Sequence, residues 1–298
     1  MVLNYESDKE VYFGGVENEY GIKLECGQKT NSPDLNSTQE EADDRINFHI
    51  THGYNNGIKS VHVISPDSDV FCSLVYHFKH TWHLNELFMR LGQGRTRRTV
   101  AIHTIVQGLD EILVANLPAI HALSGCDTTS RVGPKLACIN KTVELSNVDD
   151  FGRSPLNEEM ITNAERFLLQ CLKKQRDVLT FDDYRYEQYY DSVDFNKLVC
   201  CSSTIREHIK RAYYQSMLWY TAANPPTSFP DPINYGYQRK QETLTPVIIS
   251  GDNRPSDLPP PCTCKTCSRQ TCVCRLNNWS CSKFCKCTSS EQCKNPYN

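Results

Sequence analysis

The spacing of apolar side chains predicts alternating strands and helices in the first half of the chain. Ser60–Ile64 is a short β-branched run, typical of a buried strand, and an amphipathic helix is expected directly after it. Residues 87–91 and 98–103 predict two strands joined by a turn at residues 92–94. Two short helices are expected next, the second of them at residues 119–123.

The second half has a different pattern. Residues 158–173 and 205–220 carry apolar side chains at helical spacing. Nine prolines between positions 225 and 261 exclude regular helix and predict a linker with a short ordered patch around residues 235–237. We therefore expect an α/β domain at residues 1–145, a helical region at 155–222, a proline-rich linker at 223–261 and a small tail at 262–298.

Acidic side chains gather at three places in the first domain. Thr38 and Glu41 have capping-box spacing at the start of a predicted helix, and an Asp-x-Asp pair follows the strand Ser60–Ile64. The carboxyl end of a buried parallel strand is where α/β sheets place their sites. Ordinary helix capping and a turn remain alternative explanations for each place. The acidic residues at the three places include Glu41, Asp43, Asp67, Asp69 and Asp127.

The tail is dominated by cysteine. Nine of the sixteen cysteines lie there, at positions Cys262, Cys264, Cys267, Cys272, Cys274, Cys281, Cys285, Cys287 and Cys293. Nine thiolates satisfy three tetrahedral Zn2+ ions if three of them bridge two metals each. A disulfide scaffold leaves one cysteine over, and the N-terminus has no apolar export segment, so a reducing intracellular compartment is expected. Disulfides and unstructured reactive thiols remain the alternatives.

Composition limits the partners. The net charge of −3 excludes a chain that is basic throughout, so nucleic-acid binding has to be local. Apolar runs are too short for a membrane span. Arg95, Arg97 and Arg98 lie at the predicted hairpin tip, where they suit either contact with a phosphate backbone or a solvated turn.

The cysteine spacing of the tail, with its closing Cys293-Lys-Asn-Pro, resembles the CXC domain of tesmin-type DNA-binding proteins. In that family nine cysteines hold three zinc ions. The first gap after the opening Cys-x-Cys is shorter here, and the last gap is longer. The resemblance implies a structural zinc cluster and a DNA-binding role for the tail.

The acidic series resembles that of flap endonucleases and the wider PIN-like nuclease superfamily. Glu41-Ala-Asp43, Asp67-x-Asp69 and Gly125-x-Asp127 follow the order of the family's three acidic motifs. Residues 132–137, Val-Gly-Pro-Lys-Leu-Ala, are similar to its helix-hairpin-helix turn. The resemblance implies that the five carboxylates bind two Mg2+ or Mn2+ ions, that Gly133 and Lys135 help to hold duplex phosphates, and that the substrate is DNA.

One motif of that family has no counterpart. Flap endonucleases open with a strand that carries a metal-binding Asp, and residues 11–16 offer no such strand. The resemblance therefore implies an incomplete PIN-like parallel-sheet domain. Residues 117–130, Leu-Pro-Ala-Ile-His-Ala-Leu-Ser-Gly-Cys-Asp-Thr-Thr-Ser, are also similar to uncharacterised invertebrate proteins that are derived from mobile elements.

Two hypotheses follow. In the first, the chain is a metal-dependent nuclease with a zinc-cluster module. In the second, it is a noncatalytic DNA- or chromatin-binding protein whose α/β region is a degenerate scaffold. Both predict a nuclear protein with DNA as its partner.

Overall fold

The computed structural model describes residues 9–16, 20–37, 41–92, 94–132, 144–172, 178–190, 198–249, 262–281, 285–287 and 293–297. This part of the chain is a mixed α/β structure with small sheets, helices and a cysteine-rich cluster near the C-terminus. It forms two compact units, one of residues 1–174 and 207–247 and the other of residues 175–206 and 248–298.

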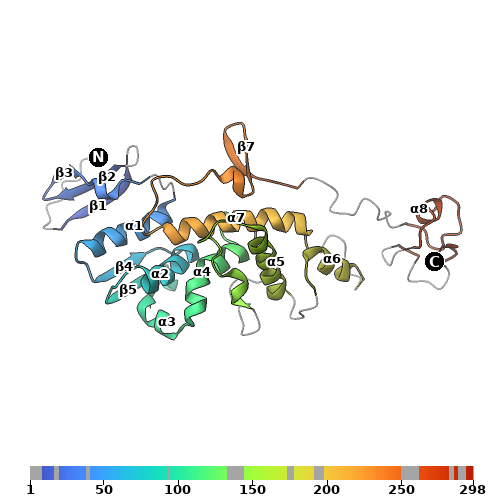
Figure 1. Ribbon diagram of the computed structural model, residues 1–298, viewed down its shortest axis with the longest axis horizontal. Coiled ribbons are helices and arrows are strands. Elements are labelled where there is room, and N and C mark those ends of the chain that lie inside the picture. The colour runs from blue at the N-terminus through green and yellow to red at the C-terminus, as the bar shows by residue number, and fades with distance from the viewer. Residues whose placement is uncertain are drawn as a thin grey trace. The chain divides into compact units, whose positions relative to one another are not determined.

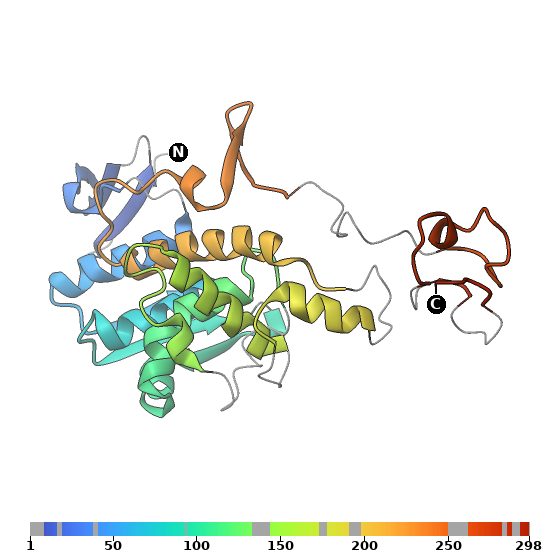
Figure 2. The ribbon, with the colours of Figure 1, turned by 45° about the vertical axis from the view of Figure 1, so that its right-hand side comes forward.

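The first unit begins with an antiparallel sheet of strands β1 (Val11–Val16), β2 (Tyr20–Glu25) and β3 (Gln28–Asn31). This sheet lies next to helix α1 (Ala42–Asn55) (Figure 2). The contact is close, because a Cβ atom on Gly14 would lie 2.5 Å from the Nε2 atom of His49 in α1. Among the described strands β1 pairs only with β2, so it does not act as an opening strand of the next sheet.

The second sheet has the order β4 (Ser60–Ile64), β5 (Glu86–Leu91) and β6 (Arg98–Ala101). β4 and β5 are parallel, and helix α2 (Ser68–His80) connects them, as the apolar spacing predicts. β5 and β6 form the predicted antiparallel hairpin. β6 ends earlier than expected because helix α3 (Ile102–Gly108) begins directly after it. The expected parallel sheet is therefore a mixed sheet of three strands.

Helices α2, α3 and α4 (Glu111–Ser124) lie beside this sheet (Figure 1). Val63, Leu87 and Met89 belong to a core that also contains side chains of α1, α2, α3 and α4. The prediction that β4 is buried is wrong in part. Its alternate residues Ser60, His62 and Ile64 are exposed, and Ile64 retains 69% of its surface. β4 is an edge strand with one solvated face, so only its inward positions are buried.

Two helix boundaries also differ from the predictions. α1 begins at Ala42 after the N-cap residue Glu41, whose side chain makes no cap hydrogen bond. The predicted capping box needs Thr38, which lies outside the described residues, so this pairing stays a prediction. The helix predicted at residues 119–123 is the end of α4, which begins at Glu111 and contains Pro118. Proline removes only one backbone hydrogen bond, and the apolar side chains around it are buried, so tertiary packing maintains the helix.

The two longer helical predictions are confirmed by α5 (Glu158–Leu172) and α7 (Ser202–Thr221). From residue 208 onward, α7 binds carbonyl oxygens of α4. His208 Nε2 donates to the Leu123 carbonyl at 2.9 Å, and the Tyr220 hydroxyl donates to the Ala115 carbonyl at 3.1 Å. α7 contacts α2 through His77, whose Nε2 donates to the Trp219 carbonyl at 2.9 Å. These bonds make α7 part of the α/β unit.

The predicted ordered patch near residue 235 is confirmed and extends further than expected. A 3-10 turn at Pro232–Tyr235 leads into a hairpin of β7 (Tyr237–Lys240) and β8 (Thr243–Pro246). Tyr213 of α7 stacks against Tyr235, with ring centroids 5.5 Å apart. Proline therefore excludes helix in this segment but permits a tight turn and a short hairpin.

The second unit contains α6 (Phe181–Tyr190) and α8 (Val273–Leu276). Thr180 and Asp183 hold the start of α6, because the Thr180 hydroxyl donates to Asp183 Oδ2 at 2.7 Å and accepts from the Asp183 amide at 3.1 Å. None of the helices within the described ranges is long and apolar enough to cross a membrane.

The buried ring of His77 makes the attachment of α7 sensitive to acid. Burial lowers the pKa of His77 from 6.5 to about 4, so the folded state holds the neutral ring. Its Nδ1 then accepts from the Thr81 hydroxyl at 2.8 Å. Below pH 6.5 the unfolded chain binds a proton that the folded chain does not, so stability decreases as the pH falls toward 4.

We predict that wild-type protein loses about 3 kcal/mol more unfolding free energy than His77→Gln between those two pH values. Urea unfolding followed by circular dichroism at each pH measures the difference. The exposed residue His83 provides the matched control, His83→Gln, which keeps the wild-type pH dependence. Equal pH dependence in wild-type and His77→Gln protein would contradict the structural role of His77.

Candidate metal centres

The loop between β4 and α2 fixes the Asp-x-Asp pair at the carboxyl end of β4. Asp67 is the N-cap of α2, and its Oδ1 accepts a hydrogen bond from the Asp69 amide at 2.8 Å. The Ser65 hydroxyl accepts from the Asp67 amide at 3.2 Å. The capping alternative is thus correct for Asp67. Capping also gives its carboxylate a defined position beside the first turn of α2.

Asp43 lies in the first turn of α1, next to the exposed N-cap Glu41. Burial raises the pKa of Asp43, and the negative charges of Asp67, Asp69, Glu41 and Asp127 raise it further. Glu41, Asp67, Asp69 and Asp127 therefore each lie near enough to Asp43 to affect its pKa. Among the described residues, groups of three or more ligand atoms within 4.8 Å of one another consist of cysteines, so these carboxylates are more widely spaced. They come from α1, from the β4–α2 loop with the start of α2, and from the loop after α4.

Sequence reasoning missed Asp44, which belongs to the same cluster. Only 4% of its surface is exposed. Burial, followed by the charges of Glu41, Asp43 and Asp69, raises its pKa from 3.8 to about 7. Asp44, Asn47 and Thr51 are polar residues at helical spacing on the buried side of α1. That spacing is visible in the sequence, and it indicates that polar residues lie on the buried side of α1.

His121 is a second missed residue. It lies in the apolar helix α4 with 1% of its side chain exposed, and its Nε2 is 2.7 Å from Asp69 Oδ1. A carboxylate only accepts hydrogen bonds, so the ring donates from Nε2. Trp219 of α7 stacks on the ring with a centroid separation of 5.4 Å. His121 therefore fixes the orientation of the Asp69 carboxylate.

The loop after α4 presents Asp127 at the surface. It begins at Gly125, whose φ of +114° favours glycine. A Cβ atom added at this position would lie 2.6 Å from the Cα atom of Arg131. The Thr129 hydroxyl donates to the Ala122 carbonyl at 2.7 Å, and Thr128 donates to Gln215 Oε1 of α7 at 2.8 Å. The loop is held on both sides while Asp127 stays exposed.

The predicted nucleic-acid contacts have different outcomes. Gly133 and Lys135 lie outside the described residues, so their role stays a prediction. Arg95, Arg97 and Arg98 are exposed in the β5–β6 connection, and their side chains make no hydrogen bond or ion pair to any residue in the described ranges. Their role in binding also stays a prediction.

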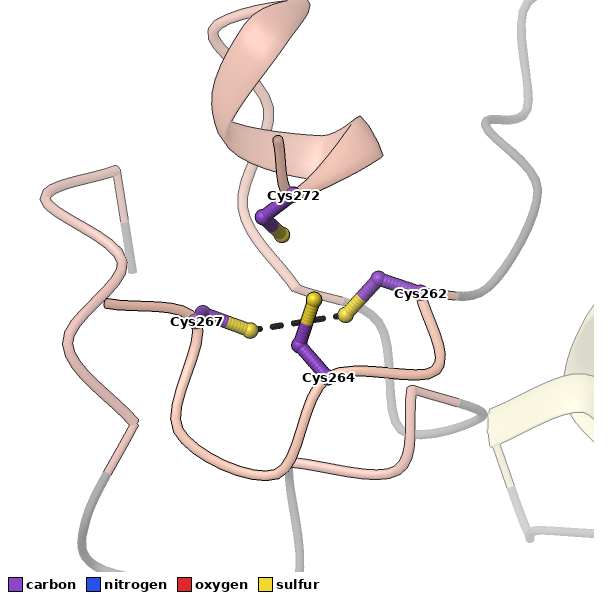
Figure 3. Close-up of side chains that lie close together, drawn as sticks. All are labelled: Cys262, Cys264, Cys267 and Cys272. Atoms are coloured by element: carbon purple, nitrogen blue, oxygen red, sulfur yellow. Dashed lines mark hydrogen bonds between the residues drawn. The ribbon is translucent and has the colours of Figure 1, made fainter. Parts of the chain in front are cut away.

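The cysteine tail gathers its sulfurs within ligand distance of one another. Three groups of four have all Sγ atoms within 4.8 Å, and Cys262 belongs to each. Figure 3 shows the first group, in which Cys262 and Cys267 are 3.4 Å apart. The groups are Cys262, Cys264, Cys267 and Cys272; Cys262, Cys274, Cys281 and Cys285; and Cys262, Cys267, Cys281 and Cys287. Cys293 also approaches, with its Sγ 3.8 Å from that of Cys281.

Cysteine forms the core of this tail. Six of its cysteines are buried, whereas the apolar side chains of Val273, Leu276 and Trp279 retain 37%, 65% and 37% of their surface. Burial and neighbouring thiols raise the pKa of Cys267 and Cys274, so crowding opposes ionisation when no cation is present. A soft all-sulfur donor set with closely spaced buried thiols fits a structural metal such as zinc, which supplies the missing positive charge.

The thiol of Cys272 has a lowered pKa. Burial alone would raise the pKa of Cys272, but hydrogen bonds from the Arg275 backbone and from Cys267 and Cys262 lower it to about 7. Cys272 is the N-cap of the short helix α8, where backbone amides are free to donate. The first group of cysteines therefore contains a thiolate near neutral pH.

Comparison with protein-family models, with curated proteins and with solved structures finds no match to this chain.

Proposed function

We propose that the chain is a divalent-cation-dependent phosphodiesterase that acts on nucleic acid at the carboxylate cluster. The observation that supports this most is the raised pKa of Asp43, to which four other acidic residues from three segments contribute. Like charges in a half-buried site are unfavourable unless a cation compensates them. Capping explains the position of Asp67, but it does not explain why the charges of Asp69, Glu41 and Asp127 also act on Asp43.

The donor set fits Mg2+ or Mn2+. Both are hard cations that prefer carboxylate oxygen, and the cluster offers oxygen from Glu41, Asp43, Asp67, Asp69 and Asp127. Two such ions supply activation of a water molecule and stabilisation of the leaving oxygen of a phosphodiester. An incomplete PIN-like nuclease domain is part of this proposal.

The surrounding residues have positioning roles in it. The Asp69 amide holds the Asp67 carboxylate, and His121 holds the Asp69 carboxylate from the buried side. Partners that orient a ligand in this way raise metal affinity. Asp44, with a pKa of about 7, retains a proton in part of the molecules at neutral pH and lowers the total negative charge of the cluster.

For the tail we propose a cluster of three zinc ions held by all nine cysteines. Cys267 and Cys281 each belong to two of the observed groups, and Cys262 to all three. If Cys293 replaces Cys262 in the third group, each cysteine is used. Cys262, Cys267 and Cys281 then bridge two metals each, and the other six are terminal ligands.

A second candidate function rests on this tail. Lys265, Arg269, Lys286 and Lys294 are exposed around the cysteine cluster. Such a surface favours phosphate, so the alternative is a noncatalytic protein that binds DNA or chromatin through the zinc module. A mobile-element origin and a nuclear location belong to either proposal.

We predict that purified, zinc-loaded, full-length protein cleaves flap, gapped or single-stranded DNA only when Mg2+ or Mn2+ is added. Asp67→Asn and Asp127→Asn are expected to lower kcat by about a hundredfold or more, because each removes a charged metal ligand. Asp34→Asn is the matched control, since Asp34 is exposed and does not contribute to the raised pKa of Asp43 or Asp44. A gel assay with labelled substrates measures both effects.

Absence of cleavage under all these conditions would reject the enzyme. DNA binding that disappears on deletion of residues 262–298 and ignores Asp67→Asn would then support the noncatalytic alternative.

The bridging assignment is tested by native mass spectrometry of the intact chain. Cys264→Ser is expected to lose at most one zinc, because Cys264 belongs to one group only. Cys262→Ser is expected to lose at least two, because it removes a shared ligand. Equal zinc content in the two variants would contradict the assignment of Cys262 as a bridge.

A further inference from the structure

Two adjoining hollows lie between the β4–α2 loop and the β5–β6 hairpin. The smaller, of about 410 Å³, is lined by Ser65, Pro66, Arg90, Gly92, Gly94 and Arg97. The larger, of about 770 Å³, shares Pro66 and Gly92 and adds Ser68 and Arg98. Ser68 is the residue between Asp67 and Asp69. The hollows therefore extend from the β4–α2 loop, beside the first turn of α2, to the arginines of the hairpin.

Both hollows are lined by arginine side chains. Arg90, Arg97 and Arg98 line them, and within the described residues no carboxylate or carbonyl accepts a hydrogen bond from these three side chains. Guanidinium groups bind phosphate oxygens through pairs of N–H donors. The smaller hollow, with two arginines, fits an anion. The larger has one arginine, Arg98, beside the apolar side chains of Phe71, Leu91, Val100 and Ile105.

The backbone of the hairpin is also open to a ligand. Gly92 and Gly94 have φ values of +73° and +53°, which favour glycine. A Cβ on Gly94 would meet no atom within 4 Å, so the peptide there is uncovered. A Cβ on Gly92 would lie 2.6 Å from the Thr96 carbonyl oxygen, so glycine is needed to close the turn. A phosphate is thus able to approach the peptide groups closely.

An aromatic surface lies along the same face of the sheet. Phe88 precedes Arg90 by two residues on β5, so both side chains are on the uncovered face. The Phe88 ring stacks on His62 of β4, with centroids 4.7 Å apart and planes at 27°. Stacked rings beside arginines are typical of surfaces that bind single-stranded nucleic acid.

We propose that these two hollows form a phosphate-binding groove that holds the backbone of a nucleic-acid single strand next to the carboxylate cluster, a role that rests on the proposed function. Hollows of this volume accept a nucleotide unit. Arg90 and Arg97 bind a phosphate in the smaller hollow, Arg98 binds one in the larger, and Phe88 with His62 stacks a base.

The test measures binding of a fluorescein-labelled single-stranded oligodeoxynucleotide to the full-length, zinc-loaded chain by fluorescence anisotropy, with no Mg2+ or Mn2+ added. The double variant Arg90→Gln/Arg97→Gln is expected to weaken binding at least tenfold. It is also expected to lower the slope of log K against log salt by about 0.7 for each phosphate that the variant no longer neutralises. Lys29→Gln/Arg166→Gln removes the same charge from exposed sites elsewhere and is expected to retain wild-type affinity and slope.

Two results would overturn the proposal. One is equal binding by the groove variant, the control variant and the wild type. The other is groove-dependent binding of inorganic phosphate without binding of the oligonucleotide, which would make the groove a site for a free anion. Asp67→Asn binding measured in parallel separates this proposal from the proposed function. If binding is retained and depends on Arg90, but neither the wild type nor any variant cleaves DNA, the groove proposal stands and the phosphodiesterase proposal is rejected.

Discussion

Repulsion between carboxylates brought together at the end of β4 is the constraint on which the rest of the first unit depends. Asp43 is half-buried and receives unfavourable charge from Glu41, Asp67, Asp69 and Asp127. The protein maintains this arrangement by several local devices. The N-cap of α2 fixes Asp67, buried His121 fixes Asp69, and the loop after α4 is pinned to α4 and α7. Fixed carboxylates of this kind suit cation binding, because a cation compensates their negative charge.

In the cysteine tail, the groups that are brought close together are thiols. Its thiols are packed where other small domains place leucine and valine, and crowding opposes their ionisation. A chain of this kind gains its folding free energy from metal binding, because its apolar side chains are too few and too exposed to form a core. The cysteine cluster is compatible with a soft cation such as zinc. For the carboxylates, a hard cation is part of the proposed function.

The sequence predicted much of this, for physical reasons that differ among the elements. α2, α5 and α7 have strong apolar periodicity, and the β5–β6 turn contains two glycines, so local patterns identify them. The exposure of Ile64 was not predictable, because a β-branched run does not reveal whether a strand lies at the edge of its sheet. The start of α1 and the passage of α4 through Pro118 depend on packing with distant segments.

The same distinction applies to the sites. The spacing of the cysteines predicted that they gather within ligand distance of one another, as the structure shows. The role of the acidic residues stays a prediction. Sequence reasoning did not identify Asp44, although Asp44, Asn47 and Thr51 recur at helical spacing. It could not identify the contact of His121 with Asp69, because 52 positions of sequence separate them. Nor did the sequence predict that Arg90 joins the hairpin arginines, since that requires the register of β4 against β5.

The most direct measurement is anomalous X-ray scattering from crystals of the full chain grown with Mn2+. The account predicts manganese peaks among Asp43, Asp67, Asp69 and Asp127, distinct from zinc peaks at the cysteine tail. Zinc peaks at the tail with no manganese peak between these carboxylates would contradict it.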